Sequence, residues 1–172
     1  MATQEGDGRL IPDPGFAGDD GAAPARLVAA LAAYAADRSR YAEALAELRQ
    51  SRLLVPVVAV LGEVEVDAAG LAHDKSSDMA TVLLTGRDGR QALLGFSGID
   101  RLHAWNPQAR PVPVTAVLAA QSAVQEGADA LLVDVAGPVQ LVVQGEDLTA
   151  LAAGWTLGRV GERTAWIRPP EE

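Results

Sequence analysis

The clearest hydrophobic pattern lies between residues 79 and 96, where two short apolar runs flank a polar turn. Glycine stands at both ends of the turn segment 86–89 and is able to adopt the positive φ that a tight hairpin needs. We therefore expect two antiparallel strands, 79–85 and 90–96. The leucines in each run are consecutive and do not alternate with polar residues, which favours strands covered on both faces.

A short helix is expected directly after this hairpin. Ile99, Leu102 and Trp105 recur at helical spacing and form one apolar stripe. Ser97 stands at the N-cap position, since its hydroxyl can accept a hydrogen bond from a first-turn N–H. The helix should end at 106–107, because a residue that precedes proline is pushed out of the α region.

Two amphipathic helices are predicted over residues 24–50, which contain no internal glycine or proline. The polar segment 37–40 separates their apolar stripes, with Ser39 as the cap of the second helix. A dimeric coiled coil is an alternative, because apolar residues also recur every seven positions. This spacing runs through Leu27, Tyr34, Tyr41 and Leu48. Arg38 falls on that seam, and the run is shorter than four heptads, so we prefer two helices that pack on their own sheet.

The rest of the chain alternates between apolar strand-like runs and short helices. Pro56 lies inside the strand expected at 53–61 and argues for an edge position or a bulge, because proline cannot donate to the ladder. Thr115 should cap a helix that Gly127 ends. The further strands are expected at 110–114, 130–135 and 139–143, with a short helix closed by Gly154 and a final strand or hairpin over 155–167.

These elements predict an α/β fold, with α+β as a possibility, built on a mixed β-sheet whose central hairpin, 79–96, is flanked by helices. Residues 1–22 are rich in glycine, aspartate and proline and are expected to form a disordered N-terminal arm. Residues 23–168 then form a single domain.

Composition narrows the classes of function. The 172 residues carry a net charge of −9 and no cysteine, which excludes thiol catalysis, disulfides and zinc–thiolate sites. An acidic surface has no electrostatic attraction for nucleic acid or anionic lipid. The longest strongly apolar run, 53–61, is shorter than the roughly 20 residues that span a bilayer, and the N-terminal segment lacks the apolar core of a signal peptide. We expect a cytoplasmic protein with no membrane or nucleic-acid partner.

Catalytic candidates are weak. The string around Ser97 is Gly-Phe-Ser-Gly-Ile, which displaces the last glycine of a nucleophile elbow, so a helix cap is the better interpretation. His73 and His103 lack convergent ligands at metal-binding spacing. We therefore expect no catalytic residue, no metal and no cofactor.

One candidate binding region remains, around the polar loop 74–78. Lys75, Asp78 and Arg110 are expected near strand ends, where they could pair with one another or hold a partner's carboxylate. Trp105 could serve as a binding anchor, although a tryptophan at stripe spacing on a helix is more often part of the core. The default alternative is a polar loop with local ion pairs.

Several segments together resemble a known family. They are 54–57, 74–80, 89–97, Leu102, Trp105 and 110–114. These segments are similar to the N-terminal domain of the SseB family, named for enhanced serine sensitivity, in its alanine-rich actinobacterial form, over roughly residues 27–155. The resemblance implies a fold and brings no catalytic residues with it.

The leading hypothesis is a non-enzymatic interaction module that binds another protein or itself. An amino-acid-related enzyme or a small-metabolite sensor is the alternative that the family's serine phenotype suggests. A secretion-linked accessory factor follows from family labels alone.

Overall fold

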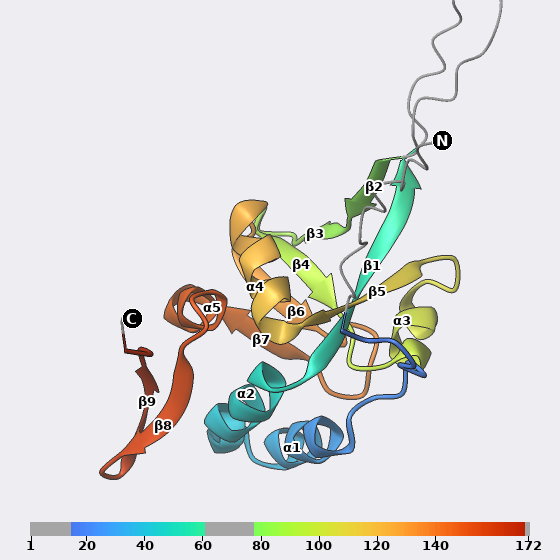
Figure 1. Ribbon diagram of the computed structural model, residues 1–172. Helices are drawn as coiled ribbons and strands as arrows, with labels where there is room; N and C mark the ends of the chain where they lie inside the picture. Colours follow the sequence, from blue (N-terminus) through green and yellow to red (C-terminus); the bar gives the residue numbers. More distant parts are fainter. Residues whose placement is uncertain (1–14, 61–77, 171–172) are drawn as a thin grey trace, which may run out of the picture.

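The computed structural model describes residues 15–60 and 78–170, which form helices packed against β-sheets (Figure 1). The helices are α1 (Ala25–Ala36), α2 (Tyr41–Arg49), α3 (Ile99–Trp105), α4 (Ala116–Gln125) and α5 (Gly145–Ala152), with a 3₁₀ turn η1 (Arg38–Arg40) between the first two. The strands are β1 (Arg52–Val60), β2 (Asp78–Thr81), β3 (Leu83–Thr85), β4 (Gln91–Gly95), β5 (Arg110–Thr115), β6 (Ala130–Val133), β7 (Leu141–Gln144), β8 (Thr156–Val160) and β9 (Arg163–Ile167). The fold is of the mixed α/β kind, as predicted.

The four-stranded sheet has the order β3-β4-β6-β7 and mixes both pairing directions. β4 and β6 are parallel, while β3 and β7 run antiparallel to their neighbours. A second sheet has the order β2-β1-β5. The two sheets meet where Leu54 of β1 and Phe96 exchange backbone hydrogen bonds of 2.8 and 2.9 Å.

The central hairpin is present, but its first strand is divided. The Gly86 N–H donates to the Arg90 carbonyl at 2.8 Å, and Gly89 has a φ of +80°, so the turn forms as the glycines predict. β2 pairs with β1, whereas β3 pairs with β4. The expected single strand 79–85 therefore passes from one sheet to the other at Val82.

The prediction that both strands of the hairpin are buried holds only for the second. Leu93 and Leu94 are fully buried, while Leu84 is 39% exposed. In the edge strand β3, Leu83 packs against a hydrophobic core on one face, while Leu84 on the other face remains partly in solvent. The consecutive leucines of β4 are covered on both faces because helices pack on one side and α3 packs on the other.

Pro56 does not place β1 at an edge, and that expectation was wrong. β1 is the middle strand of its sheet, with Pro56 opposite Pro111 of β5. On its other side, Leu54 bonds Phe96 and the pairing with β2 begins at Val57. Pro56 thus falls in the gap between these two partners, where no ladder hydrogen bond needs its missing N–H.

Helices α1 and α2 are separate, as preferred over the coiled coil. Asp37 is extended, and its side chain accepts hydrogen bonds from the Ser39 N–H at 3.0 Å and the Ser39 hydroxyl at 2.7 Å. Asp37 therefore caps η1, while Arg40 occupies the N-cap of α2 without a side-chain hydrogen bond, so Ser39 is not the cap of the second helix. Tyr34 and Tyr41 meet edge to face across the break, with ring centroids 5.9 Å apart.

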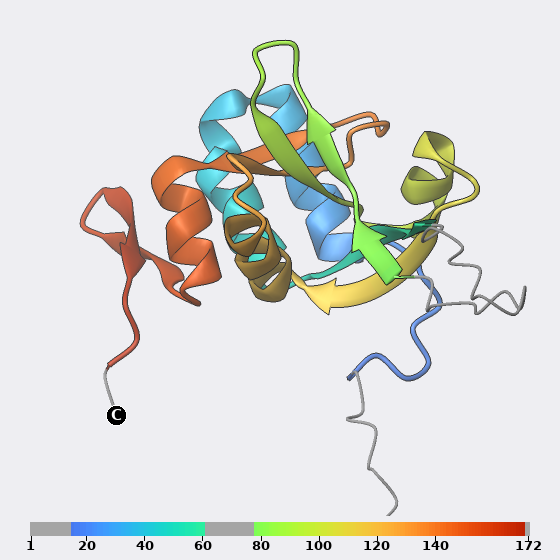
Figure 2. The ribbon, with the colours of Figure 1, turned by 90° about the horizontal axis from the view of Figure 1, so that it is seen from above.

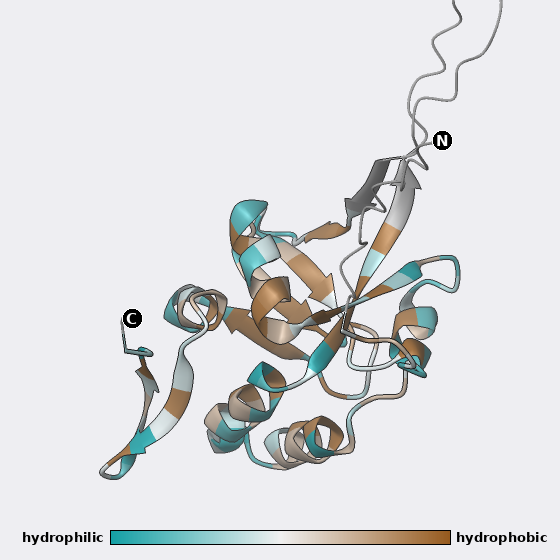
Figure 3. Cartoon of the chain, in the orientation of Figure 1, coloured by the Kyte–Doolittle hydropathy of each residue, from teal (hydrophilic) through white to brown (hydrophobic). Residues whose placement is uncertain are grey.

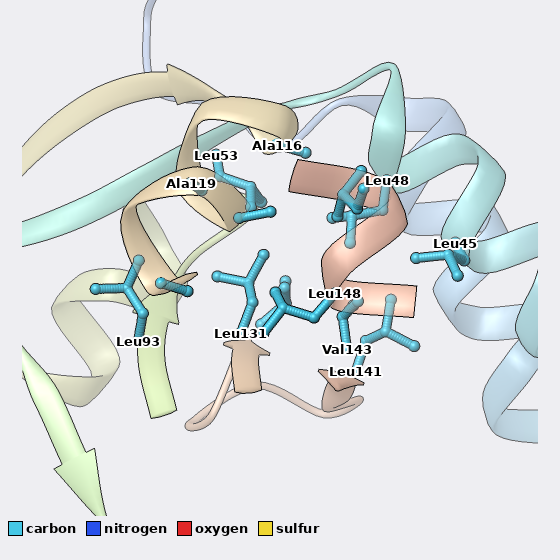
Figure 4. Packing of buried hydrophobic residues seen from close by; sticks show 14 of the residues in the cluster. Leu45, Leu48, Leu53, Leu93, Ala116, Ala119, Leu131, Leu141, Val143 and Leu148 are labelled. Carbon is cyan, nitrogen blue, oxygen red and sulfur yellow. The ribbon is translucent and has the colours of Figure 1, made fainter. Parts of the chain in front are cut away.

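The main core lies between the four-stranded sheet and helices α1, α2, α4 and α5 (Figure 4). Alternate strand residues point into it, and leucines of α2 and α5 meet them. The alanines that α4 buries let its backbone approach the sheet closely; they are Ala116, Ala119, Ala120 and Ala123. Apolar colour accordingly gathers on the central strands, with polar colour on the outer helix faces (Figure 3).

A smaller core lies on the opposite face of the same sheet, at the carboxyl end of β4. It consists of Leu54, Leu94, Phe96, Leu102 and Ala109. The expected helix 99–105 supplies Leu102, so its apolar stripe packs as predicted. The predicted Thr115 cap of α4 is also confirmed, because its side chain accepts from the Leu118 N–H at 3.1 Å.

The expected C-terminal hairpin is present as β8 and β9, beside α5 at one side of the molecule (Figure 1). Leu157 and Trp166 stand opposite each other and pack against the main core. Arg49 of α2 holds the base of the hairpin by donating to the carbonyls of Gly154 and Trp155 at 2.9 and 2.5 Å.

Part of the expected N-terminal arm contacts the domain. Residues 15–22 precede α1, and Asp19 forms an ion pair with Arg52 of β1, with 2.5 Å between Oδ2 and Nε. The Gly21 carbonyl accepts from the Ile99 N–H at 2.8 Å. Residues 1–14 lie outside the described residues.

Candidate functional site

The predicted binding residues that the structure describes lie on different elements. Arg110 is exposed at the start of β5, opposite Val57 of β1. Asp78 begins β2 and is paired with Val60 on the other side of β1. The middle strand therefore separates the backbones of Asp78 and Arg110. Lys75 lies outside the described residues.

Trp105 packs against the smaller core. Its ring lies 5.6 Å from that of Phe96, centroid to centroid, and is partly buried. This contact matches the core role that a helical stripe usually indicates, and it leaves one part of the ring in solvent.

An apolar strip crosses the outer face of the four-stranded sheet. Leu84 is paired with Ala92, and Leu132 is paired with Val142. The parallel register of β4 with β6 puts both pairs on this face, because residues opposite each other in a ladder share a side of the sheet. Val142 is 42% exposed, close to the value for Leu84. We call these four residues the open sheet face. The helices of the main core cover the other face.

The open sheet face is a shallow depression of about 180 Å³ with a polar rim. Arg90 donates to the Gln144 side chain across one end of the strip. Asp129 accepts from the Gln91 N–H at 2.9 Å. The rim groups thus satisfy one another. Leu132 borders the smaller core, while Leu84 and Val142 leave apolar surface in solvent, a combination that is typical of interaction surfaces.

A buried polar cluster lies at the carboxyl ends of the parallel strands β4 and β6. Ser97 donates to Asp134 twice, from its N–H to Oδ1 at 2.8 Å and from its hydroxyl to Oδ2 at 2.7 Å. Arg101 donates from Nη1 to the Ser97 hydroxyl at 2.6 Å, and its Nε lies 3.6 Å from Asp134 Oδ2. Ser97 and Asp134 are both fully buried.

Ser97 is therefore not the helix cap that its position suggested. Gly98 occupies the N-cap of α3, and no side chain caps it. The Ser97 hydroxyl is directed at Asp134 because the parallel pairing of β4 with β6 brings the two strand ends together. Ser97 and Asp134 are 37 positions apart in the chain. Only the strand order brings them together, so no local sequence signal could have linked them.

A second ion pair extends the cluster toward the N-terminus. Arg52 donates to the Ser97 carbonyl at 2.9 Å and to the Ala22 carbonyl at 2.7 Å, in addition to its pair with Asp19. The cluster consequently ties the segment before α1 to β1 and to the loop after β4. Two arginines and two aspartates balance its charge.

The pKa values of the Asp134 and Asp19 carboxylates are shifted in opposite directions by their surroundings. Burial raises the pKa of Asp134 and outweighs the hydrogen bonds from Ser97 and the charge of Arg101, which lower it. Burial also acts to raise the pKa of Asp19, but the Gly21 N–H and the Arg52 guanidinium together lower it below the ordinary value.

The cluster is not arranged for nucleophilic catalysis. The Ser97 hydroxyl is inaccessible to solvent, and Arg101 donates to it. A small cavity of about 70 Å³ lies beside Arg101 and Asp134, with apolar walls that include Val28 and Val139. Its volume suits a few water molecules.

Among the residues that the structure describes, no group of histidine and carboxylate side chains could hold a metal ion. Within the same residues, none of the helices has the length and apolar character needed to cross a bilayer.

The chain belongs to the SseB family: the profile of the SseB protein N-terminal domain matches residues 27–150. The match begins in α1 and ends within α5, so it includes the four-stranded sheet, the open sheet face and most of the polar cluster. Comparison with curated proteins finds no match. Comparison with solved structures finds none either. The β8–β9 hairpin lies outside the matched residues.

Proposed function

We propose that this SseB-family domain is a non-catalytic interaction module that binds a protein partner through the open sheet face. The observation that carries the proposal is the apolar strip of Leu84, Ala92, Leu132 and Val142, in which Leu84 and Val142 are both more than a third exposed. Burying such a strip would stabilise a complex by about 25 cal/mol per Å² of apolar area removed from water.

The edges formed by β5 and β7 favour the open sheet face over strand addition. Tyr41 donates from its hydroxyl to the Val142 carbonyl at 3.3 Å, which occupies an acceptor on the outer edge of β7. Pro111 and Pro113 of β5 lack the N–H that an added strand would need. At these two edges, a partner would therefore contact side chains more readily than backbone.

The predicted residues Lys75, Asp78, Trp105 and Arg110 form a second part of the proposal. Arg110 is exposed and could pair with a partner's carboxylate. Its substitution by alanine provides a separate test of this region, because it leaves the open sheet face intact.

We predict that Val142→Asp and Leu84→Asp abolish partner binding without unfolding the protein. A carboxylate in the strip would have to be desolvated in the complex, whereas in the free protein it stays in water. Affinity capture of the tagged chain from its own cells, with quantification of each retained protein, measures the loss. Sedimentation of the purified chain tests self-association in parallel.

Val124→Asp is the matched control, since Val124 of α4 is 49% exposed and lies outside the strip. The proposal requires that Val124→Asp retain the same proteins, or self-associate to the same extent, as wild type. It also requires that Val142→Asp and Leu84→Asp lose this binding. Unchanged binding in Val142→Asp and Leu84→Asp, at an unchanged melting temperature, would remove the open sheet face from consideration.

A further inference from the structure

A wide groove of about 890 Å³ separates the start of α5 from the C-terminal hairpin. Figures 1 and 2 show β8 and β9 standing beside α5 at the edge of the molecule. We call it the α5–hairpin groove; the lining residues that matter here are Glu146, Asp147, Ala150, Trp155, Thr164 and Trp166. It lies on the helix side of the four-stranded sheet and is independent of the open sheet face.

The groove combines two aromatic rings with negative charge. Trp155 and Trp166 are both half-buried, and the two charged lining residues, Glu146 and Asp147, are acidic. The Trp166 indole N–H donates to Asp147 Oδ1 at 2.8 Å, which fixes a ring and a carboxylate next to each other. Glu146 is exposed, so its carboxylate is accessible from solvent.

The chain itself shows that this aromatic surface accepts a cation. The guanidinium carbon of Arg168 lies 5.0 Å from the centroid of the Trp155 ring. A positive charge over a tryptophan face is attracted by the ring quadrupole, and tryptophan is the strongest of the aromatic side chains in this respect. A carboxylate within reach of the same cation adds a charge-assisted hydrogen bond.

We propose that the α5–hairpin groove binds the cationic side chain of an arginine- or lysine-bearing peptide segment of a partner protein. Its stem would pack on Trp166 and take the place of Arg168 on the Trp155 ring, while its charge meets Glu146 and Asp147. The net charge of −9 steers such a segment toward the protein. Arg159 stands opposite Thr164 toward the turn of the hairpin, so the cation enters at the α5 end, away from this arginine.

A titration with a blocked Gly-Arg-Gly-Arg-Gly peptide tests the proposal on the full chain. The three tryptophans give three indole N–H signals in a ¹⁵N-correlated NMR spectrum, and Trp105 packs in the separate smaller core. We expect saturable shifts of the Trp155 and Trp166 signals and a stationary Trp105 signal. The same peptide with citrulline in place of arginine is the matched neutral probe and should leave all three signals unmoved.

Variants separate the groove from general attraction to an acidic protein. Glu146→Gln with Asp147→Asn keeps the acceptor for the Trp166 indole while removing both charges, and should weaken binding about tenfold. Glu162→Gln removes one carboxylate from the hairpin turn, outside the groove, and should leave the affinity unchanged.

Four results would overturn the proposal, and the first three concern the peptide titration. They are stationary Trp155 and Trp166 signals, equal shifts with the citrulline peptide, or equal weakening in Glu162→Gln. The fourth is occupation of the groove by a second copy of the chain. In that case the Trp155 and Trp166 signals would move when the protein alone is diluted, and the mass at high concentration would be that of a dimer.

Discussion

At the scale of single residues, the buried polar cluster has the largest energetic consequence. Asp134 has a φ of +56°, a conformation that non-glycine residues adopt at a cost, and its carboxylate is fully buried. The hydrogen bonds from Ser97 and the charge of Arg101 offset part of that cost. The cluster connects the carboxyl-terminal ends of β4 and β6 through the hydrogen bonds between Ser97 and Asp134.

Asp134 should make stability depend on pH in a particular direction. Burial raises the pKa of Asp134 above the ordinary 3.8, so the folded chain keeps this proton to a higher pH than the unfolded chain. The stabilisation that protonated Asp134 contributes is fully present below its pKa in the unfolded chain, and it is lost as pH rises through its pKa in the folded chain. We predict that the free energy of unfolding of wild type, minus that of Asp134→Asn, decreases as pH rises above about 4.

Urea unfolding at a series of pH values measures this difference. The exposed carboxylate of Asp88 supplies the control Asp88→Asn, which tests whether removal of any carboxylate gives the same slope. A difference that increases with pH for Asp134→Asn would show that hydrogen bonds and Arg101 outweigh burial.

At the scale of elements, the β3–β4 turn depends on one glycine. Gly89 has a φ of +80°, and a Cβ placed there would have nothing within 4 Å. Substitution therefore introduces backbone strain without a steric clash. We predict that Gly89→Ala lowers the free energy of unfolding by about 1 kcal/mol, and that Gly89→Asn costs less because asparagine tolerates the left-handed region.

Chemical denaturation of both variants distinguishes strain from lost packing. Equal destabilisation by alanine and asparagine would contradict the backbone explanation. Because β3 is an edge strand of three residues that carries part of the open sheet face, local fraying in Gly89→Ala should also reduce partner binding there.

At the scale of the whole molecule, the C-terminal hairpin lies at the margin of the main core. The fully buried side chains all precede residue 152, and Leu157 and Trp166 only partly cover the main core. We predict that a chain ending at residue 155 still unfolds cooperatively, with a stability lower by about 2 kcal/mol from lost apolar burial.

Circular dichroism and urea unfolding of the truncated chain check this prediction. Loss of the cooperative transition would show that the hairpin belongs to the folding unit. The truncation also removes one wall of the α5–hairpin groove, while the open sheet face stays intact. The truncated chain should therefore lose binding at the α5–hairpin groove and keep binding at the open sheet face.

Local patterns along the chain were enough to locate most helices and strands. Helical periodicity located α1 to α3, the Thr115 side chain and Gly127 bounded α4, and glycines placed the turn of the central hairpin. These signals depend only on residues that are close together in the sequence, so they can be interpreted without knowledge of the fold. The family resemblance also followed from short motifs, and the match over residues 27–150 confirms it.

Only the tertiary structure decided which elements are neighbours. The division of strand 79–85 between two sheets, the central place of β1 and the pairing of Ser97 with Asp134 all depend on strand order. Strand order is set by long-range burial across the sheets, which a local pattern does not record. For the same reason, the open sheet face and the α5–hairpin groove could not be found from sequence: each is assembled from residues that lie far apart along the chain.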